Sequence, residues 1–141
     1  MNGRDNMKEQ NKIQIMTMVG EVCYLPVIEH KQLSLYVNEE LRTFFLRDPY
    51  TEIHIFHIQD VLYYQLKEER EVIVADDGTE TEYCKRLTLS IRIREQGEKT
   101  ISYEMVPRKI QISSIAYRKL CLLAKQYEFF FSRLLISKGI C

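Results

Sequence analysis

The chain has 141 residues, of which 20 are Lys or Arg and 20 are Asp or Glu, so its formal net charge is zero. With 45% hydrophobic residues, 5 Gly, 3 Pro and no Trp, the composition excludes a disordered chain, a collagen-like repeat and a small disulfide scaffold. A neutral chain also lacks the excess of Lys and Arg on which a dedicated nucleic-acid binder depends. We expect one domain with its own core over residues 12–141, preceded by a flexible segment over residues 1–11.

The sequence carries no sign of export or of membrane insertion. Residues 1–12 are polar and mixed in charge, without the apolar stretch of a signal peptide. The most apolar run, residues 120–136, is interrupted by charged and polar residues and falls short of the ~20 apolar residues that cross a bilayer. We therefore expect a cytoplasmic protein without a transmembrane segment. The four Cys residues are scattered, with no His at ligand spacing, which predicts reduced thiols and neither a metal site nor a cofactor.

Apolar and polar residues alternate with a period of two along most of the chain, which predicts strands. The expected strands are residues 13–15, 22–28, 33–37 and 42–47, then one that begins at Ile53, a longer one over 61–74 and a return strand from Tyr83 onward. Asp76-Asp77-Gly78 is a turn signal between the last two. The clearest alternation is in residues 87–94, and Gly97 can take the positive φ of a tight hairpin that leads into residues 101–105.

The last segment changes to a helical period. Apolar residues follow steps of three and four from Ser113 to about Ser137, at Ala116, Leu120, Leu123, Tyr127, Phe130 and Leu134. Ser113 or Ser114 is expected to cap the N-terminus of this helix, and Gly139 to lie at or just past its end. The pattern predicts an α+β fold, mostly β, with antiparallel strands followed by one long helix that buries its apolar face.

Two segments resemble motifs of a known fold family. The first reads Ile53-His54-Ile55-Phe56-His57-Ile58-Gln59-Asp60-Val61-Leu62-Tyr63-Tyr64, and the second, at the start of the expected helix, reads Ser114-Ile115-Ala116-Tyr117. With the order of elements over roughly residues 50–137, they resemble the bacterial PH-like (pleckstrin-homology-like) domains of small, uncharacterised Gram-positive proteins. The resemblance implies a bent antiparallel barrel of about seven strands capped by one long C-terminal helix, and it implies no activity.

Two departures separate the chain from eukaryotic PH domains that bind phosphoinositides. Those domains carry several Lys and Arg residues in the first hairpin, whereas residues 19–24 here contain one acid and no base. The sequence therefore speaks against an inositol-phosphate site. Those domains also usually carry a Trp in the helix, and here Tyr127 or Phe130 would fill that space.

Two polar features invite a metal-binding interpretation. His54 and His57 are three residues apart, so on a strand they point to opposite faces and converge on one ion only if residues 56–60 form a turn. Residues 67–82 hold seven acids against two bases, which is compatible with calcium or a basic partner, but they lack the ligand spacing of an EF-hand loop. We favour partly exposed strand histidines and a solvated acidic hairpin tip.

The C-terminal segment has the opposite charge. Residues 107–141 contain seven bases and only one acid, Glu128, which is compatible with an anionic partner, with the acidic tip of a neighbouring copy or, less favoured, with a membrane surface. The plainer interpretation is the solvated face of an amphipathic helix. Leu122 and Phe129 lie seven residues apart, together with Arg118 and Lys125, on the side of the helix where a monomer should be polar, which predicts a protein contact, although core packing by a wide helical face remains open.

These patterns contain no catalytic motif. The leading hypothesis is therefore a non-enzymatic, cytoplasmic protein-interaction or self-association module, with a protein partner or a homodimer contact at Arg118, Leu122, Lys125 and Phe129. The alternative is a small-ligand or lipid-binding barrel whose cavity is lined by aromatic residues such as Phe44, Phe56, Tyr63 and Tyr64. An enzyme whose site is assembled from distant residues comes third.

Overall fold

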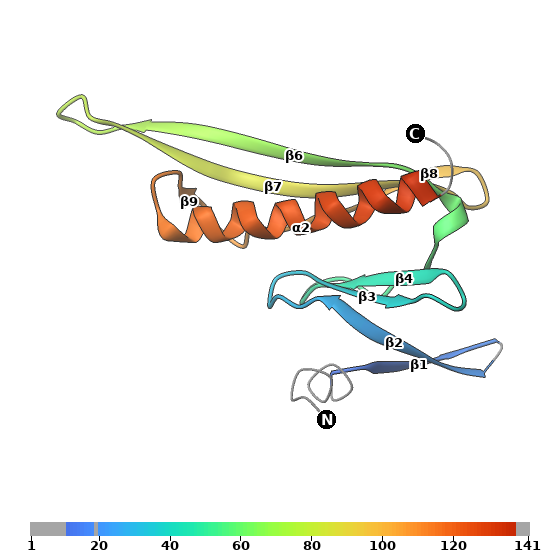
Figure 1. The fold of residues 1–141 in the computed structure, drawn as a ribbon. Coiled ribbons are helices and arrows are strands. Elements are labelled where there is room, and N and C mark those ends of the chain that lie inside the picture. The colour runs from blue at the N-terminus through green and yellow to red at the C-terminus, as the bar shows by residue number, and fades with distance from the viewer. Residues whose placement is uncertain (1–10, 19, 138–141) are drawn as a thin grey trace. The chain divides into compact units, whose positions relative to one another are not determined.

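The computed structural model describes residues 11–18 and 20–137, which form nine strands, one α-helix and one turn of 3₁₀-helix (Figure 1). The chain divides into two compact units, Met1–Asp60 and Val61–Cys141. The boundary falls inside the range predicted to be a single domain. Two compact units can belong to one domain. The single domain over residues 12–141 and the flexible segment over residues 1–11 therefore stay predictions.

The first unit is an antiparallel meander in which each strand pairs with the next. Its strands are β1 (Ile13–Thr17), β2 (Gly20–Ile28), β3 (Ser34–Asn38), β4 (Thr43–Arg47) and β5 (Phe56–His57). A hydrophobic cluster holds β1–β4 together: the Phe45 ring stacks on Tyr36 and meets Tyr24 edge to face, with both ring centroids 5.0 Å away. The Tyr24 hydroxyl is buried and hydrogen-bonded to the Thr43 Oγ1 at 2.8 Å, which offsets the cost of removing it from water.

The prediction of a strand that begins at Ile53 is wrong in its position, because the strand begins at Phe56. Strand β5 covers only Phe56–His57, and the alternating Ile53 and Ile55 precede it outside the ladder. Ile55 packs instead against the hydrophobic cluster of the unit, so its apolar character reflects packing without strand pairing. The Asp48 carboxylate accepts hydrogen bonds from the amides of Tyr50 and Thr51, at 3.1 and 2.7 Å, which turns the chain before it can pair.

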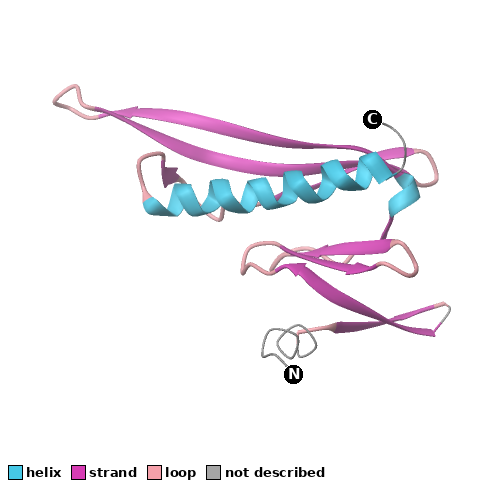
Figure 2. Ribbon diagram, viewed as in Figure 1, coloured by secondary structure: helices cyan, strands magenta, loops and turns pink. Residues whose placement is uncertain are grey.

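The second unit is an antiparallel sheet with a helix along one face (Figure 2). Its elements are β6 (Val61–Val74), β7 (Glu80–Arg94), β8 (Glu98–Glu104), β9 (Ile110–Gln111) and α2 (Ile115–Ser137). Strand β7 pairs with β6 along most of its length, and its other edge pairs with β8 and then with β9. Helix α2 packs against β6 and β9.

The β7–β8 hairpin confirms the strongest strand prediction. Leu87, Leu89, Ile91 and Ile93 are all buried, whereas the residues between them are half-buried and polar. Burying each such side chain contributes about 1.5–3 kcal/mol. At the turn, Gln96 and Gly97 take φ values of 54° and 101°, the left-handed conformation for which a glycine is suited.

Helix α2 begins as predicted but turns a slightly different face to the sheet. The Ser114 hydroxyl accepts a hydrogen bond from the Tyr117 amide at 3.2 Å, which makes Ser114 the N-cap. The buried positions are Leu120, Leu123, Tyr127, Phe131 and Leu134. Thus Phe131 replaces the predicted Phe130, which is half-buried, because the Phe131 ring is the one that stacks on Tyr64 of β6. Ala116, in the first turn of the helix, is exposed. Gly139 lies outside the described residues.

The described residues confirm a mostly β, antiparallel fold with one C-terminal helix. The predicted closed barrel of about seven strands is not confirmed, because the nine strands form two sheets and neither closes through strand pairing. The first sheet ends at β1 and β5, and in the second β6 pairs on one edge only.

Candidate interaction surface

Helix α2 is fastened to the sheet at its N-terminal end by a polar cluster. The Tyr117 hydroxyl donates to the Glu68 carboxylate at 2.8 Å and accepts from the Arg70 guanidinium at 3.1 Å. Arg70 also contacts Glu68 at 2.7 Å and Glu82 at 3.1 Å. Partial burial, and then the hydrogen bond to Glu68, raise the pKa of Tyr117 to about 12. The phenol therefore remains protonated at neutral pH and can keep donating to Glu68.

A second attachment lies nearer the C-terminal end of the helix, at Phe131 and Ser132. The Tyr64 ring stacks on Phe131 with centroids 5.3 Å apart, and its hydroxyl is hydrogen-bonded to the Ser132 Oγ at 2.9 Å. Tyr64, Glu68 and Arg70 all come from β6, so one strand supplies the helix-facing groups at both attachments. These contacts fix the rotation of α2 about its axis and therefore decide which of its residues face outward.

The outward face of α2 carries a row of large apolar side chains. Leu122 and Phe129 are 62% and 65% exposed, which confirms that they lie away from the buried face. The structure adds Ile115 and Ile136, which are 70% and 60% exposed and continue the same seven-residue spacing. Since positions seven apart drift only ~20° around a helix, the four residues form one row along its full length. We call them the outer stripe of α2.

Basic side chains accompany the outer stripe. Arg118, Lys119, Lys125 and Arg133 are all exposed and lie about 50° around the helix from the stripe, whereas the one acid of the helix, Glu128, lies about 100° from it. The Arg133 guanidinium carbon sits 5.4 Å from the centre of the Phe129 ring, a cation–π contact. Within the described residues, no acidic side chain forms an ion pair with any of these four bases. The surface is therefore both apolar and positively charged.

The β6–β7 hairpin carries the opposite charge and extends beyond the N-terminal end of α2 (Figure 1). Past the pairing of Tyr83 with Gln111, it is a two-stranded ribbon beside which the described part of the chain places no third strand. Val72, Ile73 and Val74 are 54%, 41% and 61% exposed, and Asp76, Asp77 and Glu80 are exposed at the turn. Gly78, at φ 86°, closes that turn, and hydrogen bonds from Thr79 hold the pKa of Asp77 below its usual range.

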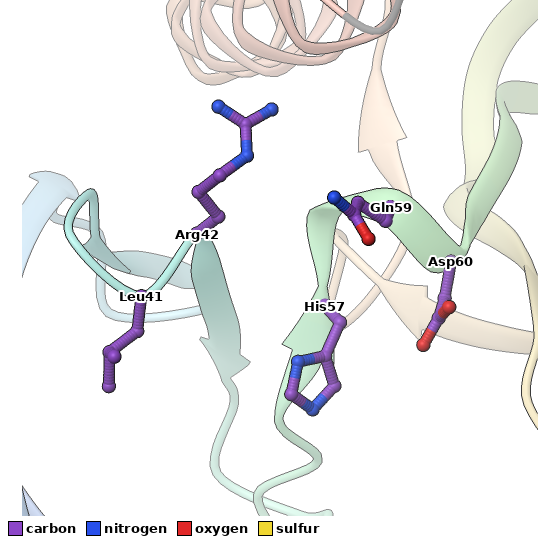
Figure 3. A pocket seen from close by; sticks show the side chains of 5 residues that line it. All are labelled: Leu41, Arg42, His57, Gln59 and Asp60. Carbon is purple, nitrogen blue, oxygen red and sulfur yellow. The ribbon is translucent and has the colours of Figure 1, made fainter.

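The histidines of the resemblance segment are not brought into a metal site. Within the described residues, no group of three or more His, Cys, Asp or Glu side chains could hold an ion. The His54 ring meets Phe56 edge to face at 4.6 Å, whereas His57 lines a pocket of about 410 Å³. Figure 3 shows the Arg42 guanidinium and the His57 ring at this pocket pointing in opposite directions. These two groups therefore do not converge in the pocket, whose other lining residues are Leu41, Gln59 and Asp60.

The aromatic residues predicted to line a ligand cavity have other contacts. Phe44 and Phe56 are buried and stack on each other in the first unit, with ring centroids 5.0 Å apart. In the second unit, Tyr64 packs on α2 and Tyr63 is 54% exposed. The contacts of these four residues do not define a shared cavity, and the ligand-binding alternative stays a prediction.

The cysteines in the described part of the chain are free thiols. Cys84 is buried, and burial raises the pKa of its thiol to about 11, whereas Cys23 and Cys121 are partly exposed. Cys141 lies outside the described residues. A thiol with so high a pKa is a poor nucleophile at neutral pH, so Cys84 acts as a small core residue.

Comparison with known proteins gives no relative from which a site could be transferred. No protein-family model, curated protein or solved structure matches this chain. Among the described residues, no helix has the length and apolar character needed to cross a bilayer.

Proposed function

We propose that this chain is a non-enzymatic PH-like interaction module of the bacterial cytoplasm, and that its contact surface is the outer stripe of α2. The observation that carries the proposal is the exposure of Leu122 and Phe129 at more than 60% each, on a helix whose other face is packed. Exposed apolar rows of this kind are typical of protein contacts. The antiparallel strands followed by a C-terminal helix support the PH-like assignment, whereas the open sheets do not supply its barrel.

Self-association is the form of this proposal that purified protein can test. We expect multi-angle light scattering to give a mass above that of one chain for the wild type and the mass of one chain for Phe129→Glu. The introduced carboxylate would have to be desolvated in the contact, at a cost of several kcal/mol. Tyr50→Glu, at an aromatic residue that is 81% exposed outside the stripe, is the matched control and should keep the wild-type mass. A wild type that already has the mass of one chain would contradict self-association.

A further inference from the structure

The overhanging β6–β7 ribbon has two chemically different faces. On β6, Val72 and Val74 alternate with Ile73, so they share the face of Arg70, which contacts the helix. Their cross-strand partners are Glu82 and Glu80, and directly paired residues lie on the same face of an antiparallel ladder. The helix side of the ribbon therefore combines two exposed valines with two glutamates, near and beyond the N-terminal end of α2.

A bulge in β7 is responsible for this arrangement. Glu69 pairs with Arg86 and Arg70 with Cys84, so Lys85 is an extra residue in β7. If Lys85 paired regularly with Arg70, the β7 residues from Cys84 to Glu80 would each move by one position and lie on the opposite face of the ribbon, because strand positions alternate. The bulge thus places Glu80 and Glu82 beside the valines. Glu82 is engaged with Arg70, which leaves Glu80 and the turn acids as the charge available to a partner.

The ribbon face and the outer stripe of α2 are complementary in both respects that matter for association. The ribbon face is apolar and acidic, whereas the outer stripe and the bases beside it are apolar and basic. Two outer stripes facing each other would instead bring together four cations from each copy, a like-charge contact that opposes association. We propose that the occupant of the outer stripe is the face of the ribbon formed by Val72, Val74 and Glu80 in a second copy of this chain, an inference that rests on the proposed function.

A charge-reversal cycle tests this contact. Glu80→Lys and Lys125→Glu should each raise the dissociation constant for self-association at least about tenfold, because each places like charges across the contact. The double variant restores an opposite-charge pair and should return the dissociation constant to near the wild-type value. Glu52→Lys, the same charge change at an exposed acid outside the ribbon, should leave it unchanged. Sedimentation equilibrium measures all five proteins, and circular dichroism checks their folding.

The outcomes separate this inference from the proposed function. Dissociation by Phe129→Glu without any effect of Glu80→Lys would overturn the ribbon as occupant and leave the helix surface in place. If Lys125→Glu strengthens association, the stripes pair with each other and the inference is wrong. If the wild type has the mass of one chain and co-sediments with phosphatidylserine vesicles, whereas the Phe129→Glu variant does not co-sediment with them, the occupant is a membrane. Failure of the double variant to recover would likewise contradict the contact.

Discussion

At the scale of single residues, Tyr117 links the sheet to the start of α2. Its hydroxyl donates to Glu68 and accepts from Arg70, and its backbone amide donates to the Ser114 hydroxyl that caps the helix. The Ser-x-x-Tyr pattern was visible in the sequence, but its partners on β6 were not, because they are 47 and 49 residues away along the chain.

Tyr117→Phe should lower the free energy of unfolding by about 1 kcal/mol at pH 7, since it removes one hydrogen-bonded hydroxyl and leaves Glu68 with one donor fewer. The difference between variant and wild type should also depend on pH. The folded pKa of Tyr117 is raised to about 12 from 10.0, so its contribution is complete below pH 10 and is lost as the pH rises through 12. Urea unfolding at pH 7, 10 and 11.5 measures this.

Tyr50→Phe is the control for that experiment, because Tyr50 is 81% exposed, and its free energy of unfolding should match that of the wild type. A Tyr117→Phe difference that stays constant from pH 7 to 11.5 would contradict the protonated, carboxylate-bound phenol.

At the scale of elements, the rotation of α2 determines which of two neighbouring phenylalanines belongs to the core. Phe131 is fully buried against Tyr64, whereas Phe130 is half-buried and meets Phe131 edge to face at 5.1 Å. Apolar steps of three and four fit either residue, so the sequence pattern chose the wrong one. The choice depends on how the helix lies on β6, which is a property of two elements together.

Phe131→Ala should therefore cost about 3–5 kcal/mol of unfolding free energy, because it leaves a cavity beside Tyr64. Phe130→Ala is the matched comparison on the same helix and should cost clearly less, since its ring is only partly removed from water. Chemical denaturation of both variants measures the two costs, and equal values would show that the helix is rotated from the position described.

At the scale of the whole molecule, the zero net charge conceals a separation of charge. The β6–β7 tip is acidic and the outer stripe of α2 is surrounded by bases, and both lie in the second compact unit. Each copy of the chain thus carries two complementary surfaces. The proposed self-association of a chain that is neutral overall rests on this separation.

Self-association should consequently weaken as salt is added. The Debye length falls from ≈ 10 Å at 0.1 M to 3 Å at 1 M ionic strength, so exposed opposite charges at the rim of the contact attract each other less. We expect a higher dissociation constant in 0.5 M than in 0.05 M NaCl by sedimentation equilibrium, and a smaller salt effect for Phe129→Glu because little complex remains. Stronger association in salt would indicate a purely apolar contact.

The sequence by itself determined most of the strands, the β7–β8 hairpin, the capped C-terminal helix and the position of Leu122 and Phe129 off its main apolar face. These follow from local rules: side-chain period, turn residues and hydrogen bonding within a few positions. The sequence left open whether Leu122 and Phe129 are exposed or packed in the core. Extending the seven-residue spacing would also have found Ile115 and Ile136. Tertiary structure alone decided the open sheets, the Lys85 bulge and the ribbon face, because pairing register and helix rotation depend on residues far apart in the chain.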